Sequence, residues 1–418
     1  MGKLLEKIIQ SKIHDLHPEK FSPSYQFGFQ KAHSTQHALF KFSNDVLVNL
    51  RNKLCTVAVS LDIEKAFDRV YHRGLIFKLV QIGFDHGIIK IISSFLSDRK
   101  FFVLINECSS DLGVCNCGVP QGSILAPLIY NIFMFDFPHS HNNSLSILYA
   151  DDSLVYAHNK FPTLALRMVE NHLEKINNFY KYWGVKINEA KTVPICIRNA
   201  SGKGPRGVVK ESRDLILNLN GHNIRFQNQM KYLGVTFTNL FKFNFQANDM
   251  VKKCNNRFQA LSMIMKNTNL STRTKILFYK VSLRPVLMYA LPIWFHFSPS
   301  LMKKIEIFER KIIRFCLNKN FIHFKKRYSN KYIYSNSKVL PFNKYAIRAV
   351  LRFFDHVRNC DNPLISDDIL SQSSHTWVKS KYLPPLGINK ENIINDVNHP
   401  EAFCSNFYVK STPGSHRG

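Results

Sequence analysis

One short segment with two adjacent carboxylates constrains the fold of this chain more than any other feature. In "ILYADDSLVYA", residues 147–157, two apolar and β-prone runs flank Asp151 and Asp152, which predicts a hairpin with both aspartates at its tip. Tight two-residue turns usually contain Asn-Gly or Asp-Gly, because those residues tolerate positive φ. Two neighbouring aspartates repel each other unless a cation lies beside them. The segment is therefore either a solvated turn or half of a metal site.

The charge composition indicates a polyanionic partner. The 418 residues include 57 Lys and Arg but only 29 Asp and Glu, which gives a net charge of +28. An excess of this size favours nucleic acid as the partner over an anionic membrane surface. The longest nearly apolar stretches are shorter than the roughly 20 residues that cross a bilayer. We therefore expect an intracellular protein without membrane association, whose nine cysteines are reduced.

The spacing of apolar residues predicts alternating helices and strands before a domain boundary that we place near residue 240. Helices are expected at residues 1–20, 34–52, 73–83, 88–98, 124–137 and 163–183. Strands are expected at residues 55–63, 101–105, 185–188, 192–197 and 231–237, and a loop rich in Gly, Lys, Arg and Ser at 199–213. From about residue 246 the pattern is typical of helices with aromatic and basic faces, including 271–296 and 301–317.

A third aspartate, Asp62, ends the predicted strand at 57–62. The order of strands and helices is compatible with a small βαββαβ sheet, which would bring this strand beside the hairpin. Three carboxylates at the ends of neighbouring strands suit Mg²⁺ rather than Zn²⁺. Two such ions about 3.5–4 Å apart support an in-line phosphoryl displacement. Taken singly, each aspartate is more often a solvated turn residue or a helix cap.

Several blocks in unbroken order resemble motifs of reverse transcriptases, and more narrowly those of jockey-type non-LTR retrotransposons. The blocks similar to motifs A, B and C are "SLDIEKAFDRVYHRGLIFKL", "GVPQGSILAP" and "LYADDSLVYA". Those similar to the fingers, D, E and thumb motifs are "FGFQKAHSTQHAL", "WGVKINEAKT", "MKYLGVTF" and "LRPVLMYALPIW". One such block is a weak signal, whereas this series spans residues 1 to about 320 in register.

The resemblance implies an α+β, right-hand polymerase fold with a ferredoxin-like palm. The expected parts are partial fingers at 1–56, a palm with fingers insertions that holds motifs A to E at 57–240, a helical thumb at 241–320, and a C-terminal extension of unknown role at 321–418. The chain begins inside what resembles the first fingers block. We therefore expect a truncated element that lacks the upstream fingers strands and the endonuclease domain of the family.

The resemblance also implies the site residues that hold metal. Asp62 and Asp151 would bind both catalytic ions, and Asp152 would support the metal and the primer end. The backbone carbonyl of Ile63 would be a further ligand. The implied cofactor is a pair of Mg²⁺ ions, for which Mn²⁺ can substitute.

The remaining implied site residues contact the substrate. Phe67 would lie under the sugar of the incoming nucleotide, where a bulky ring clashes with a 2′-hydroxyl, although a core aromatic is the alternative. Gln121 and Gly122 would lie against the nucleotide and the template. Lys191 would protonate the departing pyrophosphate, although it could equally be one of many solvent-facing lysines.

The function implied is RNA-directed DNA polymerisation by two-metal nucleotidyl transfer to a DNA 3′-hydroxyl. The expected partners are an RNA template, a DNA primer or target, and deoxynucleoside triphosphates. The expected location is intracellular, with the nucleus used during integration and the cytoplasm for ribonucleoprotein assembly. The sequence does not indicate an oligomeric state.

Three alternatives stay open. A viral-type RNA-dependent RNA polymerase would be expected to carry Gly-Asp-Asp at the hairpin and a polar residue at the position of Phe67. A group II intron maturase, or another cellular reverse transcriptase, would need a maturase-like tail after residue 320. The third alternative is a catalytically inactive, truncated remnant whose positive charge serves RNA binding alone, and a primer-extension assay would separate it from an enzyme.

Overall fold

The computed structural model describes residues 2–16, 23–199, 212, 214–267, 269–294, 299–318 and 328–365. The chain divides into two compact units between Phe241 and Lys242. The loop expected at 199–213 falls almost wholly outside the described residues, as does most of the expected extension at 321–418. No helix within the described ranges is long and apolar enough to cross a membrane.

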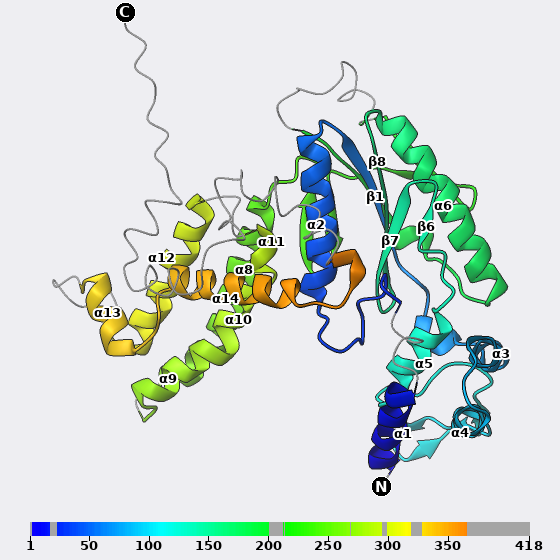
Figure 1. The fold of residues 1–418 in the computed structure, drawn as a ribbon. Coiled ribbons are helices and arrows are strands. Elements are labelled where there is room, and N and C mark those ends of the chain that lie inside the picture. The colour runs from blue at the N-terminus through cyan, green and yellow to red at the C-terminus, as the bar shows by residue number, and fades with distance from the viewer. Residues whose placement is uncertain are drawn as a thin grey trace, which may run out of the picture. The chain divides into compact units, whose positions relative to one another are not determined.

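The first unit is built on an antiparallel sheet, for which the described residues give the strand order β6-β7-β8-β1-β9 (Figure 1). The strands are β1 (Cys55–Leu61), β6 (Ser140–His141), β7 (Ser144–Tyr149), β8 (Asp152–Asn159) and β9 (Val193–Ile197). Numbered along the chain, the four long strands lie in the order fourth, first, third, second. This is the order of a ferredoxin-like βαββαβ unit, so the predicted α+β class with a ferredoxin-like palm is confirmed.

Two helices cover opposite faces of this sheet (Figure 1). They are α2 (Thr35–Arg51) and α6 (Pro162–Tyr182). Because alternate residues of a strand point to opposite faces, Tyr156 of β8 turns its hydroxyl to Asp45 of α2 at 2.5 Å. On the other face, Ser144 of β7 lies 2.8 Å from the ring of His172 in α6. With both faces covered, β1 is buried along nearly its whole length, as its run of small and β-branched residues predicts.

A group of helices of the first unit lies at one end of the sheet (Figure 1). They are α1 (Gly2–Leu16), α3 (His72–Ile82), α4 (His86–Leu96) and α5 (Ala126–Phe133). Lys78 of α3 is buried, with its Nζ 2.5 Å from Asp136 and 3.9 Å from the ring centroid of Trp183. Burial lowers the pKa of Lys78 to about 8, although the hydrogen bond and charge of Asp136 oppose this shift.

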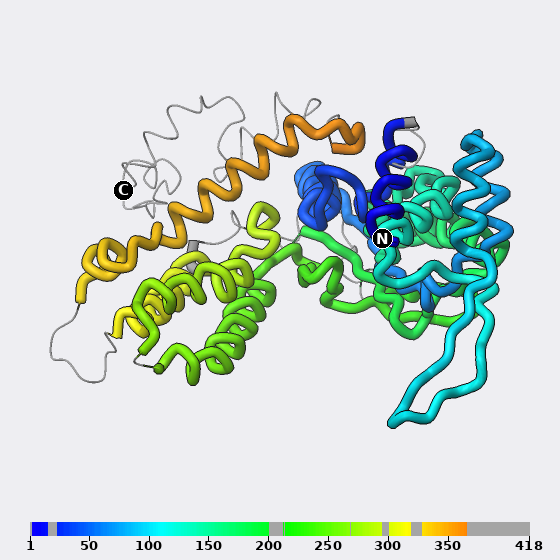
Figure 2. Tube along the Cα trace, turned by 90° about the horizontal axis from the view of Figure 1, so that it is seen from below, coloured from blue at the N-terminus to red at the C-terminus, as the bar shows by residue number. Residues whose placement is uncertain are grey.

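The strand predicted at 101–105 is wrong in part, because this segment is a protruding ribbon (Figure 2). It consists of four two-residue strands, β2 (Lys100–Phe101), β3 (Leu104–Ile105), β4 (Cys108–Ser109) and β5 (Gly113–Val114), paired β2 with β5 and β3 with β4. The side chains of residues 101–105 are all at least half exposed. An isolated two-stranded ribbon has no face against which to bury them.

Two further strand predictions need correction. The strand predicted at 231–237 is a hairpin of β12 (Gln229–Tyr232) and β13 (Val235–Thr238). Leu233 and Gly234 both have positive φ, 43° and 75°, as a tight I′-type turn requires. The strand predicted at 185–188 contributes only the isolated bridge between Ile63 and Ile187. A second hairpin, β10 (Ile216–Leu219) and β11 (His222–Arg225), precedes β12 in the chain.

The second unit, which begins at Lys242, is helical in its described parts (Figure 1). Its elements are α8 (Asn244–Met265), α9 (Thr272–Phe278), a π-helical turn η3 (Tyr279–Leu283), α10 (Arg284–Met288), α11 (Leu291–Trp294), α12 (Pro299–Cys316), α13 (Asn330–Ser337) and α14 (Phe342–Arg358). The helix predicted at 271–296 is thus broken, first by the π turn before Pro285 and again at Ala290, where φ is +50°.

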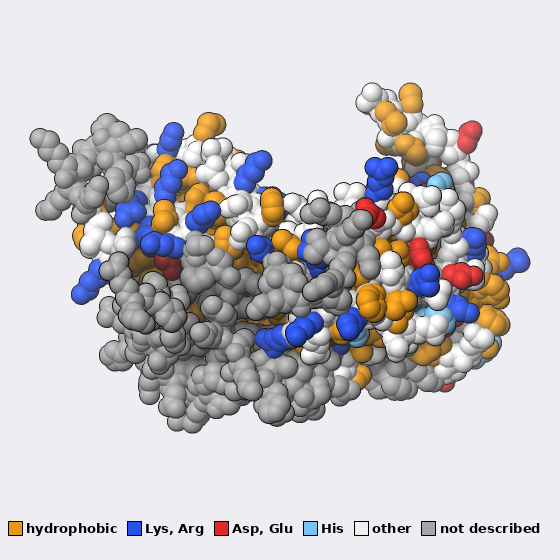
Figure 3. All heavy atoms as spheres, turned by 90° about the horizontal axis from the view of Figure 1, so that it is seen from above, with side chains coloured by type: hydrophobic (Ala, Val, Ile, Leu, Met, Phe, Trp, Pro, Cys, Tyr) orange, Lys and Arg blue, Asp and Glu red, His pale blue; other side chains and the backbone are white. Residues whose placement is uncertain are grey.

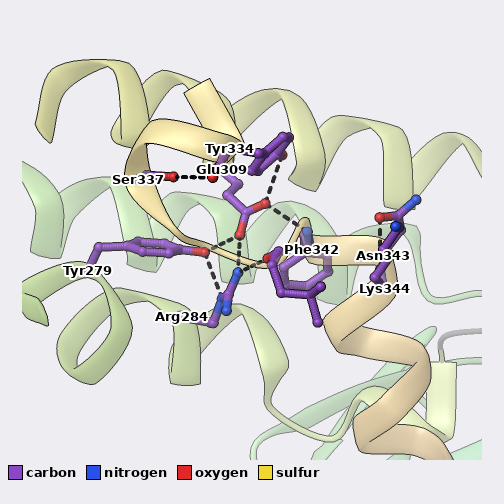
Figure 4. Close-up of polar contacts among 9 residues, drawn as sticks. Tyr279, Arg284, Glu309, Tyr334, Ser337, Phe342, Asn343 and Lys344 are labelled. Atoms are coloured by element: carbon purple, nitrogen blue, oxygen red, sulfur yellow. Dashed lines mark hydrogen bonds and ion pairs between the residues drawn. The ribbon is translucent and has the colours of Figure 1, made fainter. Parts of the chain in front are cut away.

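A buried polar network holds this helical unit together (Figure 4). Glu309 of α12 is fully buried and accepts from Arg284 Nη2 at 2.8 Å, from Tyr334 Oη at 3.0 Å and from the backbone N–H of Phe342 at 2.8 Å. The hydroxyl of Tyr279 also donates to Glu309. Because these partners come from η3, α10, α13 and α14, the structure continues as one unit past residue 320. The division into fingers, palm, thumb and extension stays a prediction.

Candidate active site

Strand register brings the three aspartates to one edge of the sheet. Leu61 of β1 pairs with Ser153 of β8, so the next residue on each strand, Asp62 and Asp152, continues the same register. Asp151 lies in the turn of the β7–β8 hairpin, one residue before Asp152. The sequence could predict this edge because a ferredoxin-like order places β1 next to β8.

The three carboxylates at this edge repel one another. Burial raises the pKa of Asp152, and the negative charges of Asp151 and Asp62 raise it further. As the side chains stand, no three Asp, Glu, His or Cys side chains in the described ranges form a group that could hold a metal ion. Instead, Asp62 Oδ2 lies 3.3 Å from Lys191 Nζ. The donor set still fits a hard divalent cation, which would relieve the repulsion among the carboxylates.

Lys191 and Ile63 both lie at this edge. Lys191 is the last residue of the short 3₁₀ helix η2 (Glu189–Lys191), whose first turn is capped by the side chain of Asn188. The backbone N–H of Asn188 donates to the Asp62 carbonyl at 2.8 Å, which fixes η2 beside β1. Ile63 directly follows Asp62 and is bridged to Ile187. The Lys191 side chain lies against a site aspartate, as the proton-donor interpretation expects. Two thirds of its surface is exposed, as the interpretation of a solvent-facing lysine expects.

The loop after Asp62 pairs with the "GVPQGS" loop, which joins two segments that are 50 residues apart in the sequence. The Val119 N–H donates to the Phe67 carbonyl at 3.0 Å, and the Gly118 N–H to the Val70 carbonyl at 2.8 Å. Gly118 has a φ of +84°, and a Cβ there would lie 2.8 Å from the Asp68 carbonyl oxygen. Glycine is therefore required for the two loops to approach this closely.

Phe67 and Gln121 lie on the two loops of this pair. The Phe67 ring stacks on buried Tyr130 of α5, with centroids 4.6 Å apart and planes at 22°, and Phe29 contacts it edge-on at 5.9 Å. Phe67 is nevertheless only partly buried. Gln121 Nε2 donates to Asp68 Oδ1 at 3.2 Å. These contacts hold a partly exposed aromatic ring on the loop that follows Asp62.

Gly122 lies in an open part of the same loop. Its φ is +84°, and a Cβ built there would meet nothing within 4 Å, so its backbone conformation, rather than crowding by protein atoms, favours glycine. The N-terminal helix α1 supports the loop, because Lys3 Nζ donates to the Gly122 carbonyl. Glu6 Oε2 accepts from the Ser123 hydroxyl and from the Ile124 N–H, both at 2.6 Å.

Sequence reasoning missed the buried polar residues that support the backbone of the aspartate hairpin. Gln26 is fully buried and bonds the backbone of Ala150, the residue before Asp151. Asn131 of α5 donates to the carbonyl of Gly28 at 3.0 Å. The only signal in the sequence was a polar residue and a glycine among the aromatics of "YQFGF", and nothing local indicated a partner more than 120 residues away.

Comparisons with known proteins agree with this geometry. Residues 1–237 match the family model described as "Reverse transcriptase (RNA-dependent DNA polymerase)". The "RNA-directed DNA polymerase from mobile element jockey" of Drosophila melanogaster is 31% identical over 323 residues, which are 75% of this chain and 34% of that protein. The "Probable RNA-directed DNA polymerase from transposon BS" of the same species is 29% identical, over 75% of this chain and 35% of that protein. The chain thus spans about a third of the length of these relatives.

Among solved structures, apo telomerase from Candida tropicalis aligns with a TM-score of 0.43 and 16% identity, over 83% of this chain and 58% of that chain. The 237 residues matched by the reverse transcriptase family model exceed half of the chain, and they include both strands that carry the aspartate edge. On that ground the chain belongs to the reverse transcriptase family, and its similarity there is to the polymerases of jockey and related non-LTR elements.

Proposed function

We propose that this chain is an RNA-directed DNA polymerase that extends a DNA 3′-hydroxyl with deoxynucleoside triphosphates on an RNA template. The observation that carries the proposal is the β1–β8 register, which aligns Asp62 with the Asp151–Asp152 turn. The partly exposed ring of Phe67 and the open backbone at Gly122 lie on loops that adjoin this edge. Membership of the reverse transcriptase family supports the same reaction.

The carboxylates of Asp62, Asp151 and Asp152, with the carbonyl of Ile63, would hold two Mg²⁺ ions, or Mn²⁺ in their place. When bound, such ions lower the pKa of an attacking hydroxyl and neutralise charge on a leaving phosphate. The oxygen donors at this edge are of the hard type that these ions prefer. Burial and the repulsion from Asp151 and Asp62 raise the pKa of Asp152. A bound cation would relieve that repulsion, which favours cation binding here.

Other residues of the chain would position the substrate. Phe67 would lie under the sugar and exclude a 2′-hydroxyl by steric clash, since its ring is backed by Tyr130 and cannot retreat. Gln121 would contact the nucleotide from the loop opposite, where Asp68 orients its amide. The space beside Gly122 would admit the template or nucleotide backbone.

Lys191 would act as the proton donor. In the reaction the bond from the primer 3′-oxygen to the α-phosphorus forms, and the bond from that phosphorus to the bridging oxygen breaks. The 3′-hydroxyl loses its proton, and pyrophosphate leaves with a negative charge that a proton can reduce. The ammonium of Lys191 lies 3.3 Å from Asp62 Oδ2, so it is at the edge where pyrophosphate would depart.

The basic surface would bind the RNA template and the DNA primer. On the face drawn in Figure 3, Lys and Arg side chains clearly outnumber Asp and Glu side chains. This agrees with the net charge of +28, and phosphate neutralisation by such side chains supplies most of the affinity for a nucleic acid. We further propose that the protein acts in the nucleus during integration, after assembly with RNA in the cytoplasm.

Primer extension on a poly(rA)–oligo(dT) substrate with Mg²⁺ tests this function. The wild-type chain is expected to extend the primer, and Asp151→Asn to reduce extension at least a hundredfold. Glu174→Gln is the matched control, because it removes one carboxylate from an exposed position on α6 and is expected to leave extension unchanged. A wild-type chain that binds the hybrid but does not extend it would contradict the proposal and favour an inactive RNA-binding remnant.

A further inference from the structure

The residue immediately before Asp151 has a strained backbone. Ala150 has a φ of +57°, in the left-handed region that a residue with a Cβ adopts only at a cost in free energy. The turn of the hairpin depends on this conformation, because the last β7–β8 pair is Tyr149 with Asp152. Something outside the hairpin must therefore favour it, since alanine has no intrinsic preference for it.

The side chain of Gln26 supplies that contact. Gln26 Oε1 accepts from the Ala150 N–H at 2.9 Å, and Gln26 Nε2 lies 3.4 Å from the Ala150 carbonyl oxygen. The same Oε1 accepts from the Gly28 N–H at 2.8 Å. Gln26 is fully buried, so these hydrogen bonds do not compete with bulk water.

The segment that carries Gln26 is itself fixed against the hairpin. The Phe27 N–H donates to the Leu148 carbonyl, and the Leu148 N–H donates to the Tyr25 carbonyl, both at 2.8 Å. A Cβ on Gly28 would lie 2.3 Å from the Ala150 nitrogen, so only glycine allows this approach. Because the backbone pairing already holds β7, the side chain of Gln26 is left to link the turn to its own segment through Ala150 and Gly28.

We propose that Gln26 is a positioning residue for the catalytic hairpin, which clamps the peptide groups of Ala150 so that Asp151 is presented at the edge with Asp62. This rests on the proposed polymerase function, and it assigns the "QFGF" segment a role in the geometry of the reacting centre. Gln26 does not touch the substrate. Its effect is transmitted through two backbone groups to the carboxylate that follows them.

Gln26→Met tests the clamp, because methionine has a similar volume but no amide. Gln30→Met is the matched control, since Gln30 lies in the same segment and its side-chain amide donates to the Pro23 carbonyl at 3.1 Å rather than to the hairpin. Hydrogen exchange of peptides spanning residues 25–30 and 148–153 is expected to accelerate at least tenfold in Gln26→Met and not in Gln30→Met. Exchange in β1 is expected to stay unchanged in both.

Primer extension provides the second measurement. Gln26→Met is expected to lower kcat by about tenfold to a hundredfold, the effect of a small misplacement of a reacting group, and to leave KM for the deoxynucleotide within twofold. A loss confined to stability, or a rise in KM with kcat unchanged, would overturn the positioning role. If Gln26→Met does not fold, Gln26→Asn replaces it, because its shorter side chain cannot reach Ala150.

The two measurements separate this inference from the proposed function. If the wild-type chain does not extend a primer, the proposed function fails, while hydrogen exchange still reports whether Gln26 restrains the turn. Unchanged exchange at residues 148–153 in a folded Gln26 variant would refute the clamp, whether or not the wild type is active.

Discussion

At position 67 one side chain has features of both roles between which the sequence could not choose. One face of the Phe67 ring is stacked on Tyr130, as for a core aromatic, and the ring is still only partly buried, as for a substrate contact. Such a backed ring is a more rigid steric barrier than a free one. Its role in sugar selection stays a prediction that substitution can test.

Phe67→Ala is expected to admit ribonucleoside triphosphates, because removing the ring leaves room for a 2′-hydroxyl. The ratio of ribonucleotide to deoxynucleotide incorporation should rise by at least tenfold in primer extension. Phe77→Ala is the matched control, since Phe77 is an exposed phenylalanine of α3. Unchanged sugar selectivity in Phe67→Ala would remove Phe67 from the nucleotide site.

The burial of His172 predicts that the folded protein loses stability in mild acid. It is fully buried in α6, its Nε2 donates to the Pro138 carbonyl at 2.6 Å, and its Nδ1 lies 2.8 Å from Ser144 Oγ. Burial lowers the pKa of His172 below its ordinary value of 6.5, and the nearby His141 and His139 lower it further, against the opposing bond to Pro138. Between that lowered pKa and 6.5, the unfolded chain binds a proton that the folded chain does not.

The free energy of unfolding should therefore fall as the pH drops below about 7 and should level off below the folded pKa of His172. Chemical denaturation of wild type and His172→Asn between pH 5 and 8 measures this, and the variant should show a shallower pH dependence. His222→Asn, at an exposed position, should retain the wild-type slope. Equal slopes in wild type and His172→Asn would refute the assignment.

At the scale of elements, the sequence predicts the helices and turns whose residue pattern lies within the element itself. The helix at 163–183, the helix stop at Gly83, where φ is +79°, and the hairpin around Asp151 all follow from periodicity and turn chemistry. The strand predicted at 231–237 failed because β-prone residues on both sides of Gly234, such as Tyr232 and Val235, look the same whether the chain continues or reverses. The clamp by Gln26 could not be predicted, because its partner is 124 residues away.

The buried ion pair of the helical unit gives a prediction at this scale. Arg284→Met should destabilise the protein by about 3–5 kcal/mol, because Glu309 would keep its buried charge without its cation. Lys253→Met, which breaks the exposed Lys253–Asp249 pair in α8, should change the free energy of unfolding by less than about 1 kcal/mol. Equilibrium denaturation of the whole chain measures both, and similar losses would contradict the special role of the network.

At the scale of the whole molecule, positive charge should dominate affinity for an RNA–DNA hybrid. Binding should weaken steeply with salt, because each neutralised phosphate releases a condensed counterion. If about six phosphates are contacted, affinity should fall by about a thousandfold between 50 and 200 mM salt. Titration at four or more salt concentrations gives the slope, and a flat response would mean that the net charge of +28 is not used for binding.

The ribbon at residues 100–114 makes self-association in concentrated solution an expected behaviour of this protein. Phe101 to Ile105 are five consecutive apolar residues, each at least half exposed, and open strand edges of this kind pair readily with other copies. A single charge acts as a gatekeeper in such runs. Val103→Lys, at a position with little contact to lose, would therefore improve solubility during purification.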